Sequence, residues 1–381
     1  MKLLIVRGYG SIMNIGNYNT QEIGLAKAFI NKGIDADIVF YGGNEETYIQ
    51  RWSVANGKNI NIYWLKGRQY LKHGVMPEVY ELAEKYDILW LDEFNQYTSF
   101  ELIKRYSDKV CVYHGPYEQN YNLPRKILNG LTSRLFFREK FAESVQVFSK
   151  SKLAEEYLKK VGFKNVETIG VGLDSSRFCN YEDLDLSEFG ISEDERYLLY
   201  VGTIDERRNV LFLLEILKKL HEKGSDCKLV LVGKAKKQYW SKCKKVVEES
   251  DLQNNVIYIE CLNQNQLPML YKNAEVFLFP TRYDIFGMVL MEAMIFETPV
   301  ISSYNGGSST LITDKENGFI CSDSVDEWVK TTEKILNNSD LAEHMGKLAR
   351  HTILESFNWD AIVCRILPII EDVVDEKRTK C

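Results

Sequence analysis

Short apolar runs alternate with helix-like segments along almost the whole chain, and this alternation is the feature that most constrains the fold. The runs KLLIV (2–6), ADIVFY (36–41), YDILWL (86–91) and KVCVYHG (109–115) are each bounded by polar or turn residues. Amphipathic patterns such as SKLAEEYLKKVG (151–162) lie between them. Strands that are apolar on both faces and alternate with helices are typical of a parallel sheet covered by helices in an α/β fold.

The alternation occurs twice. Residues 174–196 are rich in acids and show little periodicity, and a second series then begins with RYLLYVG (196–202). At about 100–200 residues per domain, the 381 residues predict two domains. We therefore predict two Rossmann-like parallel-sheet domains facing a central cleft. They are residues 1–175 and 197–357, joined by an acidic linker at 176–196, with a helix at 358–381 that is interrupted at Pro368 and packs back on the first domain.

The composition excludes several classes of protein. The net charge of −6 gives no reason to expect binding to nucleic acid. The eight cysteines are scattered, with none at zinc-finger spacing, which predicts reduced thiols in a cytoplasmic protein. No apolar run approaches 18 residues, so no membrane span is expected. Of the two D-x-D patterns, the one at 35–37 opens a predicted strand and the one at 183–185 lies in the linker. We expect no metal site at either.

The first loop, RGYGSIMNIGNYNTQE (7–22), is rich in glycine but matches no dinucleotide pattern. Met13 stands where G-x-G-x-x-G requires its third glycine, and a Walker A sequence is absent. Asn19 and Glu22 resemble a helix N-cap and its capping-box partner. A loop of this kind that leads into a helix can hold a phosphate. A tight turn that binds no ligand is the alternative.

Two further segments follow predicted strands and carry side chains suited to chemistry. His114 ends the strand VCVYH, where it either reaches a binding crevice or is a structural histidine. Arg207 and Arg208, in YVGTIDERRNV (200–210), precede a predicted helix. Two adjacent cations beside a helix N-terminus suit a diphosphate, and a solvated charged turn is the alternative.

The stretch PTRYDIFGMVLMEAMIFETPVISS (280–303) contains two acids around an almost wholly apolar helix. If the helix begins at Phe286–Gly287 and its N–H groups hold a phosphate, Glu292 lies five residues on, about 7.5 Å along the axis. Glu292 could then accept ribose hydroxyls, and Asp284 would lie on the side of a sugar. The alternative is that one acid is simply paired with a basic neighbour, because a buried carboxylate is costly when unpaired.

These segments resemble the retaining glycosyltransferases of family 4, which have the GT-B fold. The family pattern E-G-F-G-x-x-x-x-E-A-M-x-x-G-x-P-V is similar to D-I-F-G-M-V-L-M-E-A-M-I-F-E-T-P-V at 284–300, with Asp284 in place of the first Glu. The stretch 200–210 resembles a branch with G-T-L-E-P-R-K-N, so Arg208 matches the phosphate-binding Lys and Thr203 the usual Arg. HG at 114–115, 147–178, LVLVGKA (229–235), NGFICSD (317–323) and ESFNW (355–359) also fit. The resemblance covers nearly the whole chain.

The resemblance implies transfer of a hexose from a nucleotide-diphosphate sugar with retention at the anomeric carbon, usually without a metal or other cofactor. The C-terminal domain would hold the nucleotide, for which UDP is expected, and the N-terminal domain the acceptor. Glu292 would bind the ribose and Asp284 the hydroxyls of the donor sugar. Arg208, helped by Arg207, would neutralise the departing diphosphate.

The other expected donor contacts come from the glycine-rich loop, the histidine and the helix start. Gly16 would let the first loop approach the phosphates, His114 would contact the donor sugar near the reacting carbon, and Phe286, Gly287 and Met288 would complete the donor site. The expected catalytic residues are His114, Asp284 and Arg208. No separate base is implied, because in front-face transfer the leaving phosphate takes the proton of the acceptor.

The acceptor is expected to be a saccharide or a lipid-linked saccharide of bacterial surface polysaccharide assembly. Residues 122–140 (NLPRKILNGLTSRLFFREK) form a basic amphipathic pattern that could lie on an anionic membrane, at the inner face of the plasma membrane, or simply present a solvated basic face. Two alternative functions remain: a GT-B nucleotide-sugar epimerase, and a non-catalytic protein that binds a nucleotide sugar.

Overall fold

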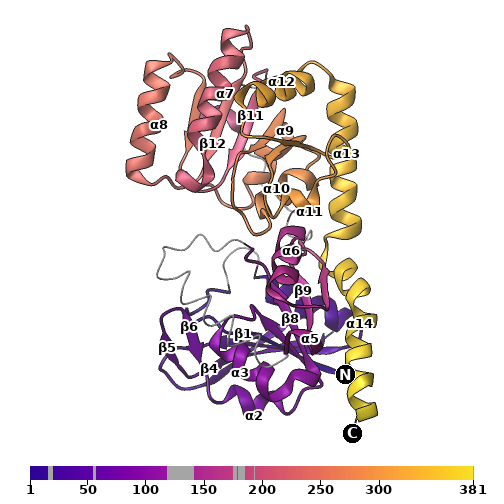
Figure 1. Cartoon of the computed structure of the whole chain (residues 1–381). Coiled ribbons are helices and arrows are strands. Elements are labelled where there is room, and N and C mark those ends of the chain that lie inside the picture. Colours follow the sequence, from indigo (N-terminus) through magenta and orange to yellow (C-terminus); the bar gives the residue numbers. More distant parts are fainter. Residues whose placement is uncertain are drawn as a thin grey trace. The chain divides into compact units, whose positions relative to one another are not determined.

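The computed structural model describes residues 1–15, 20–54, 57–117, 141–174, 178, 185–192 and 194–380. The chain forms two compact units (Figure 1). The first contains Met1–Asp174 and Phe357–Cys381, and the second contains Ser175–Ser356. Residues 185–192 and 194–196, which the sequence analysis placed in a linker, belong to the second unit.

The first unit is built on a sheet that has eight strands among the described residues. In spatial order these are β10 (Val166–Thr168), β9 (Gln146–Ser149), β8 (Val110–His114), β7 (Ile88–Asp92), β1 (Lys2–Arg7), β2 (Asp35–Tyr41), β4 (Asn59–Leu65) and β3 (Tyr48–Ser53). All neighbouring pairs are parallel except β3 with β4, which is antiparallel and forms one edge. Sequence analysis expected only parallel strands, so the antiparallel pairing of β3 with β4 was not predicted.

Strand order in the first unit reverses beside β1. The chain passes from β1 to β2 on one side and later returns to place β7 on the other side. Such a switch point opens a crevice at the carboxyl ends of the two strands, where ligands of α/β sheets bind. The remaining elements of this unit are α1 (Gln21–Asn31), β5 (Arg68–Tyr70), β6 (His73–Val75), α2 (Val79–Ala83), α3 (Tyr97–Tyr106), η2 (Ser107–Lys109), α5 (Phe141–Ser144), α6 (Lys152–Val161) and α14 (Trp359–Lys380).

Trp359 fixes the C-terminal helix α14 to the first unit. Its indole lies so close to Gly24 of α1 and to Gly172 that a Cβ atom on either glycine would come within 2.3 Å of the ring. Helix α14, drawn in yellow in Figure 1, runs beside this unit and continues without a break through Pro368. The predicted interruption is therefore wrong.

The physical reason is the position of Pro368 on the exposed side of α14. Proline removes one helical N–H and usually bends a helix. Here the opposite face is buried at a spacing of four residues, through Ile362, Ile366, Ile370 and Val374, and this packing holds the two halves of the helix in line.

The second unit is built on six parallel strands. In spatial order they are β13 (Val256–Ile259), β12 (Lys228–Val232), β11 (Tyr197–Val201), β14 (Val276–Phe279), β15 (Val300–Ser303) and β16 (Phe319–Cys321). The order reverses between β11 and β14, which are direct neighbours. Every residue of β11, β14 and β15 is buried, as expected for strands covered on both faces.

Helices and short helical turns flank the strands of the second unit. They are η4 (Leu186–Phe189), η5 (Glu206–Arg208), α7 (Val210–Glu222), α8 (Lys237–Glu249), α9 (Leu267–Asn273), α10 (Met288–Ile295), α11 (Ser308–Leu311), α12 (Val325–Leu336) and α13 (Ser339–Ser356). The loops after β11 and β12 approach each other closely, because a Cβ atom on Gly233 would lie 2.2 Å from the Gly202 carbonyl oxygen. Glycine at 233 is required for this approach.

Candidate active site

The switch point of the second unit brings together the two predicted donor-binding segments. Residues 202–209 follow β11, and residues 280–287 follow β14. Because β11 and β14 are parallel neighbours, these two loops leave the sheet at the same edge, side by side. This is where ligands bind in open parallel sheets.

Arg208 and Asp284 connect these two loops. The Arg208 Nη1 atom lies 2.6 Å from Asp284 Oδ2 and 3.5 Å from the Thr281 hydroxyl. The guanidinium also lies over the Phe279 ring at 5.6 Å. Asp205 fixes the start of the arginine loop, since its side chain accepts from the Arg208 N–H at 3.1 Å. The cation is thus held at a defined position at the sheet edge.

The second oxygen of Asp284 caps the turn that leads into helix α10. Asp284 Oδ1 accepts from the Phe286 N–H at 3.1 Å and from the Gly287 N–H at 2.6 Å. Gly287, the N-cap of α10, has φ of 71°, which favours glycine. Sequence analysis assigned these N–H groups to a phosphate and the carboxylate to a sugar. In the structure, the short Asp284 side chain reaches back and accepts from these N–H groups itself.

Asn305, which follows the neighbouring strand β15, holds the loop after β14, and sequence analysis missed it. Its side chain is completely buried, donates to the Thr281 carbonyl at 2.9 Å, and accepts from the Gly307 N–H at 2.9 Å. The backbone of Gly307 passes so close to Phe286 that a Cβ atom there would lie 2.2 Å from the Phe286 carbonyl oxygen. The signal that could have found it is the polar sequence Asn-Gly-Gly directly after a buried strand.

Glu292 lies on α10 with only 3% of its surface exposed. One carboxyl oxygen, Oε2, accepts from the Tyr271 hydroxyl at 2.9 Å, and the other, Oε1, has no hydrogen-bond partner among the described residues. Burial raises the pKa of the Glu292 carboxyl to about 8. A buried carboxyl oxygen without a partner is costly, so this atom is suited to a ligand hydroxyl.

The remaining predicted donor contacts of the second unit lie around the same loops. Arg207 donates to the Tyr283 carbonyl at 2.8 Å and lies 3.7 Å from Asp284 Oδ2. Phe286 is buried, and Met288 is the first residue of α10. Gly16 and the predicted helix at 122–140 lie outside the described residues.

A second group of charged side chains lies at the switch point of the first unit. Five of its members stand at or directly after the carboxyl ends of four neighbouring strands, and the sixth, Glu22, comes from helix α1. The five are Arg7 at β1, Asp92 and Glu93 at β7, His114 at β8 and Lys150 at β9. Only His114 was predicted as a site residue. Glu22, expected as a capping-box partner, instead accepts from Arg7 at 2.9 Å.

Glu93 and His114 form the centre of this group. Glu93 Oε2 lies 2.5 Å from His114 Nδ1, and both side chains are almost completely buried. The Gly115 N–H donates to Glu93 Oε1 at 3.3 Å, and Lys150 Nζ lies 3.9 Å from the same oxygen. Burial acts to raise the pKa of Glu93, but His114, Lys150 and the Gly115 N–H outweigh it and lower the pKa below its usual value. Glu93 is therefore a buried carboxylate.

The pKa of Asp92, the residue before Glu93, is shifted in the opposite direction. Burial raises the pKa of Asp92 to about 7, although Lys150 opposes the shift. The surroundings thus shift the pKa values of these two adjacent carboxyl groups in opposite directions. Such a difference is common where protons are held or moved. Sequence alone could not show this, because the residues come from separate strands and meet only through the sheet order.

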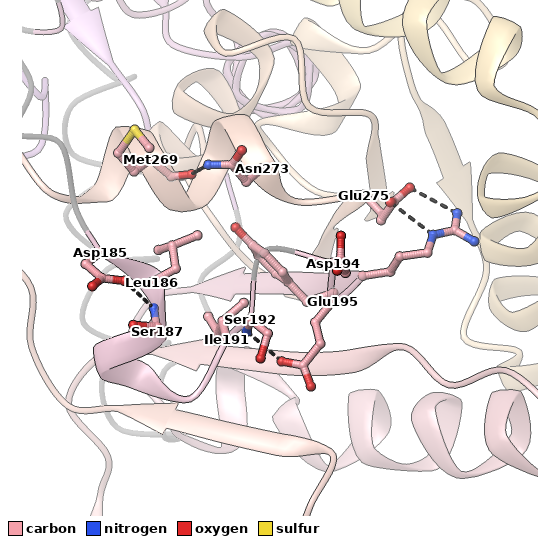
Figure 2. Close-up of a pocket in the computed structure, with 12 residues that line it drawn as sticks. Asp185, Leu186, Ser187, Ile191, Ser192, Asp194, Glu195, Met269, Asn273 and Glu275 are labelled. Atoms are coloured by element: carbon pink, nitrogen blue, oxygen red, sulfur yellow. Dashed lines mark hydrogen bonds and ion pairs between the residues drawn. The ribbon is translucent and has the colours of Figure 1, made fainter.

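A cavity of about 1050 Å³ lies at the opposite edge of the second unit. Figure 2 shows residues of η4 and the following turn on one side of it, and Met269 and Asn273 of α9 on another. Arg196, which precedes β11, and Glu275, which precedes β14, form a bidentate ion pair at the rim of the cavity. Arg196 Nε lies 3.0 Å from Glu275 Oε1, and Arg196 Nη2 lies 3.1 Å from Glu275 Oε2. Because these residues stand at the amino ends of the strands, the cavity is separate from the switch point.

The comparisons with known proteins agree on the fold. The complex of Anabaena HepE with UDP superposes with a TM-score of 0.74 and 15% sequence identity, covering 98% of this chain and 100% of that one. The fold is therefore GT-B, as the resemblance implied. The family model described as "Glycosyl transferases group 1" matches residues 182–352, so this part of the chain is similar to that family.

Two curated proteins are similar to this chain in sequence. An uncharacterized glycosyltransferase of Methanocaldococcus jannaschii is 22% identical over 368 residues, which is 89% of this chain and 90% of that protein. The capsular polysaccharide biosynthesis glycosyltransferase CapM of Staphylococcus aureus is 28% identical over 206 residues, 50% of this chain and 52% of CapM.

Two features are absent from the part of the chain that the structure describes. None of the helices there is both long and apolar enough to cross a membrane. In the same part of the chain, no three His, Cys, Asp or Glu side chains are grouped in a way that could hold a metal ion.

Proposed function

We propose that this protein is a group 1 glycosyltransferase that transfers a hexose from UDP-hexose, with retention at the anomeric carbon, to a saccharide or lipid-linked saccharide of a bacterial surface polysaccharide. The observation that carries the proposal is the cation–carboxylate arrangement at the switch point of the second unit. Arg208, Arg207, Asp284 and the start of α10 converge there, about one and a half helical turns from Glu292. UDP is favoured because HepE, which shares the fold, binds it.

The diphosphate is the group that this site is built to bind. Two guanidinium groups and the positive end of the α10 dipole meet beside Asp284. In the transfer step the bond between the anomeric carbon and the leaving phosphate oxygen breaks, and negative charge develops on the diphosphate. Fixed cations that need no rearrangement stabilise this charge and lower the barrier.

The two acids divide the donor between them. Glu292 Oε1 offers a buried position for a ribose hydroxyl, while Tyr271 holds Oε2. Asp284 would exchange its contacts with the Phe286 and Gly287 N–H groups for hydroxyls of the hexose. The N–H groups released in this exchange then become donors for the β-phosphate.

Retention at the anomeric carbon is proposed to occur by front-face transfer, in which no separate base takes part. We propose that the leaving phosphate oxygen accepts the proton of the attacking acceptor hydroxyl on the same face of the sugar. The new glycosidic bond then forms on the face that the phosphate leaves. His114 would contact the hexose near the reacting carbon from the first unit, and Gly16 would let the first loop approach the phosphates.

A role in surface polysaccharide assembly is supported by the similarity to CapM, which is named for capsular polysaccharide biosynthesis. The basic pattern at 122–140 would place the enzyme peripherally on an anionic membrane at the cytoplasmic side. Flotation with vesicles of phosphatidylcholine, with and without phosphatidylglycerol, tests this part. Binding that needs the anionic lipid supports it, and no binding to either vesicle removes it.

The proposed activity is tested with a panel of UDP-, GDP- and ADP-hexoses. We expect UDP-hexoses alone to raise the melting temperature and to be slowly hydrolysed, and the released hexose to keep its anomeric configuration by NMR. Stabilisation by none of the panel would contradict the proposal. An epimerised sugar from donor alone would support a nucleotide-sugar epimerase, and binding without any turnover would support a non-catalytic binding protein.

A further inference from the structure

The pairing of His114 with Glu93 in the first unit has a defined geometry. Nδ1 is the ring nitrogen that faces the carboxylate, at 2.5 Å from Oε2. The contact with His114 is the largest influence that keeps Glu93 a carboxylate, and Lys150 and the Gly115 N–H, which lie on its other oxygen, add to it. A carboxylate accepts hydrogen bonds and donates none. A contact this short is therefore attractive only when Nδ1 carries a proton.

The ring of His114 is also held in its plane. Phe94 packs against it at 4.7 Å between ring centres, and Tyr157 lies parallel to it at 6.1 Å. Its carbonyl oxygen accepts from the Lys150 N–H at 2.8 Å, which fixes the backbone at the end of β8. Because Nδ1 contacts Glu93 and the neighbouring rings pack against the imidazole, Nε2 is the ring nitrogen that can interact with another molecule.

Nε2 of His114 is buried and has no hydrogen-bond partner among the described residues. A buried ring nitrogen of this kind is costly unless a ligand completes its hydrogen bond. Glu93 itself has φ of 60°, a left-handed conformation that a non-glycine residue adopts at a cost. Strained backbone of this kind often accompanies a functional role.

We propose that Glu93 is a positioning residue for the transfer reaction: it fixes His114 as the form protonated at Nδ1 and thereby presents Nε2 to the hexose of the bound donor. The proposal rests on the proposed function, since it requires His114 to contact the donor sugar. Lys150 has a supporting part, because it holds Glu93 ionised in a group that also contains Asp92, Arg7, Glu22 and Tyr113.

The first test is NMR of the ring nitrogens and needs no turnover. In the wild-type chain labelled with ¹⁵N-histidine, we expect the Nδ1 signal of His114 to be that of a protonated nitrogen. The signal is assigned by its loss in His114→Asn. In Glu93→Gln the amide can donate to Nδ1, so we expect the proton to move to Nε2. His73, whose Nδ1 lies 3.0 Å from Gln96 Oε1 in the same unit, is the internal control and should not change.

The second test is kinetic and separates positioning from a general structural effect. We expect Glu93→Gln to lower kcat about 100-fold while KM for the donor changes by less than about threefold. In the His114→Asn background the same substitution should change kcat by less than about twofold, because Glu93 acts only through His114. Glu249→Gln, which removes the exposed partner of Lys245, is the matched control and should leave kcat unchanged.

The outcomes distinguish this inference from the proposed function. An unprotonated Nδ1 in the wild type, or the same His114 signals in Glu93→Gln, overturns the inference even if the enzyme transfers a hexose. Independent effects of the two substitutions on kcat also overturn it. A wild-type chain without turnover contradicts the proposed function and with it the role towards the donor, while the NMR result still decides whether Glu93 fixes the His114 ring.

Discussion

Arg208 and Asp284 form an ion pair, with Nη1 2.6 Å from Oδ2, that joins the loop after β11 to the loop after β14. Only 16% and 14% of the two side chains are exposed, so solvent and salt screen the pair less than a surface ion pair. The same carboxylate caps the turn into α10 through its other oxygen. One side chain therefore organises both parts of the proposed diphosphate site.

Substitutions of Asp284 separate two of its roles, the hydrogen bonds that cap the turn into α10 and the negative charge beside Arg208. Asp284→Asn keeps an oxygen for the Phe286 and Gly287 N–H groups but loses the charge next to Arg208, so we expect the free energy of unfolding to fall by about 1–2 kcal/mol. Turnover should fall as well. Asp284→Glu keeps the charge and restores the family residue, so it should retain most of the turnover. Urea unfolding and donor hydrolysis measure the two effects, and an Asn variant with full turnover would contradict the proposed role.

The buried carboxyl of Glu292 makes stability depend on pH. Burial raises its pKa from 4.5 to about 8, so between these values the folded state keeps a proton that the unfolded chain has lost. The contribution is fully present below pH 4.5, and it is lost as pH rises through about 8 at no more than about 1.4 kcal/mol per pH unit.

Glu292→Gln cannot ionise, so its stability relative to the wild type should increase as pH rises. Urea unfolding of both proteins near pH 5 and near pH 8 measures this change. The same variant should bind UDP more weakly, because an amide whose oxygen accepts from Tyr271 turns its NH2 group, which cannot accept, towards the ribose. A stability difference that is equal at the two pH values would show that Glu292 is not buried as described.

Turnover should be independent of divalent metal. The proposed site neutralises the diphosphate with Arg207, Arg208 and the start of α10 rather than with a cation. We expect the initial rate in an excess of EDTA to equal the rate in buffer with Mg²⁺. A rate that falls in EDTA and returns with Mg²⁺ would contradict this assignment of charge.

Most of the fold could be predicted because buried parallel strands have a strong local pattern. The runs that become β1, β2, β7, β8 and β11 to β16 are almost continuously apolar and are bounded by turn residues. The edge strand β3 was missed because its residues are largely exposed and its pairing is antiparallel. The continuous α14 was also missed, since the effect of Pro368 depends on which side of the helix is buried.

The candidate site was predictable where it is local in sequence. Arg208 and Asp284 stand in the loops that follow β11 and β14, and their types indicate phosphate and hydroxyl contacts. Their pairing with each other depends on β11 and β14 being neighbours, which the sequence does not state. Glu93 and Asn305 were missed for the same reason, because each is defined by a partner from another strand.

The central claim is that the diphosphate binds beside Arg208, and calorimetric titration of UDP tests it most directly. The chain offers a matched control at the other edge of the same sheet, where Arg196 pairs with Glu275. We expect Arg208→Gln to raise the Kd for UDP at least about 10-fold, the loss of a charged hydrogen bond, and Arg196→Gln to leave the Kd unchanged. Equal Kd values for the wild type and Arg208→Gln, with both proteins folded, would contradict the account.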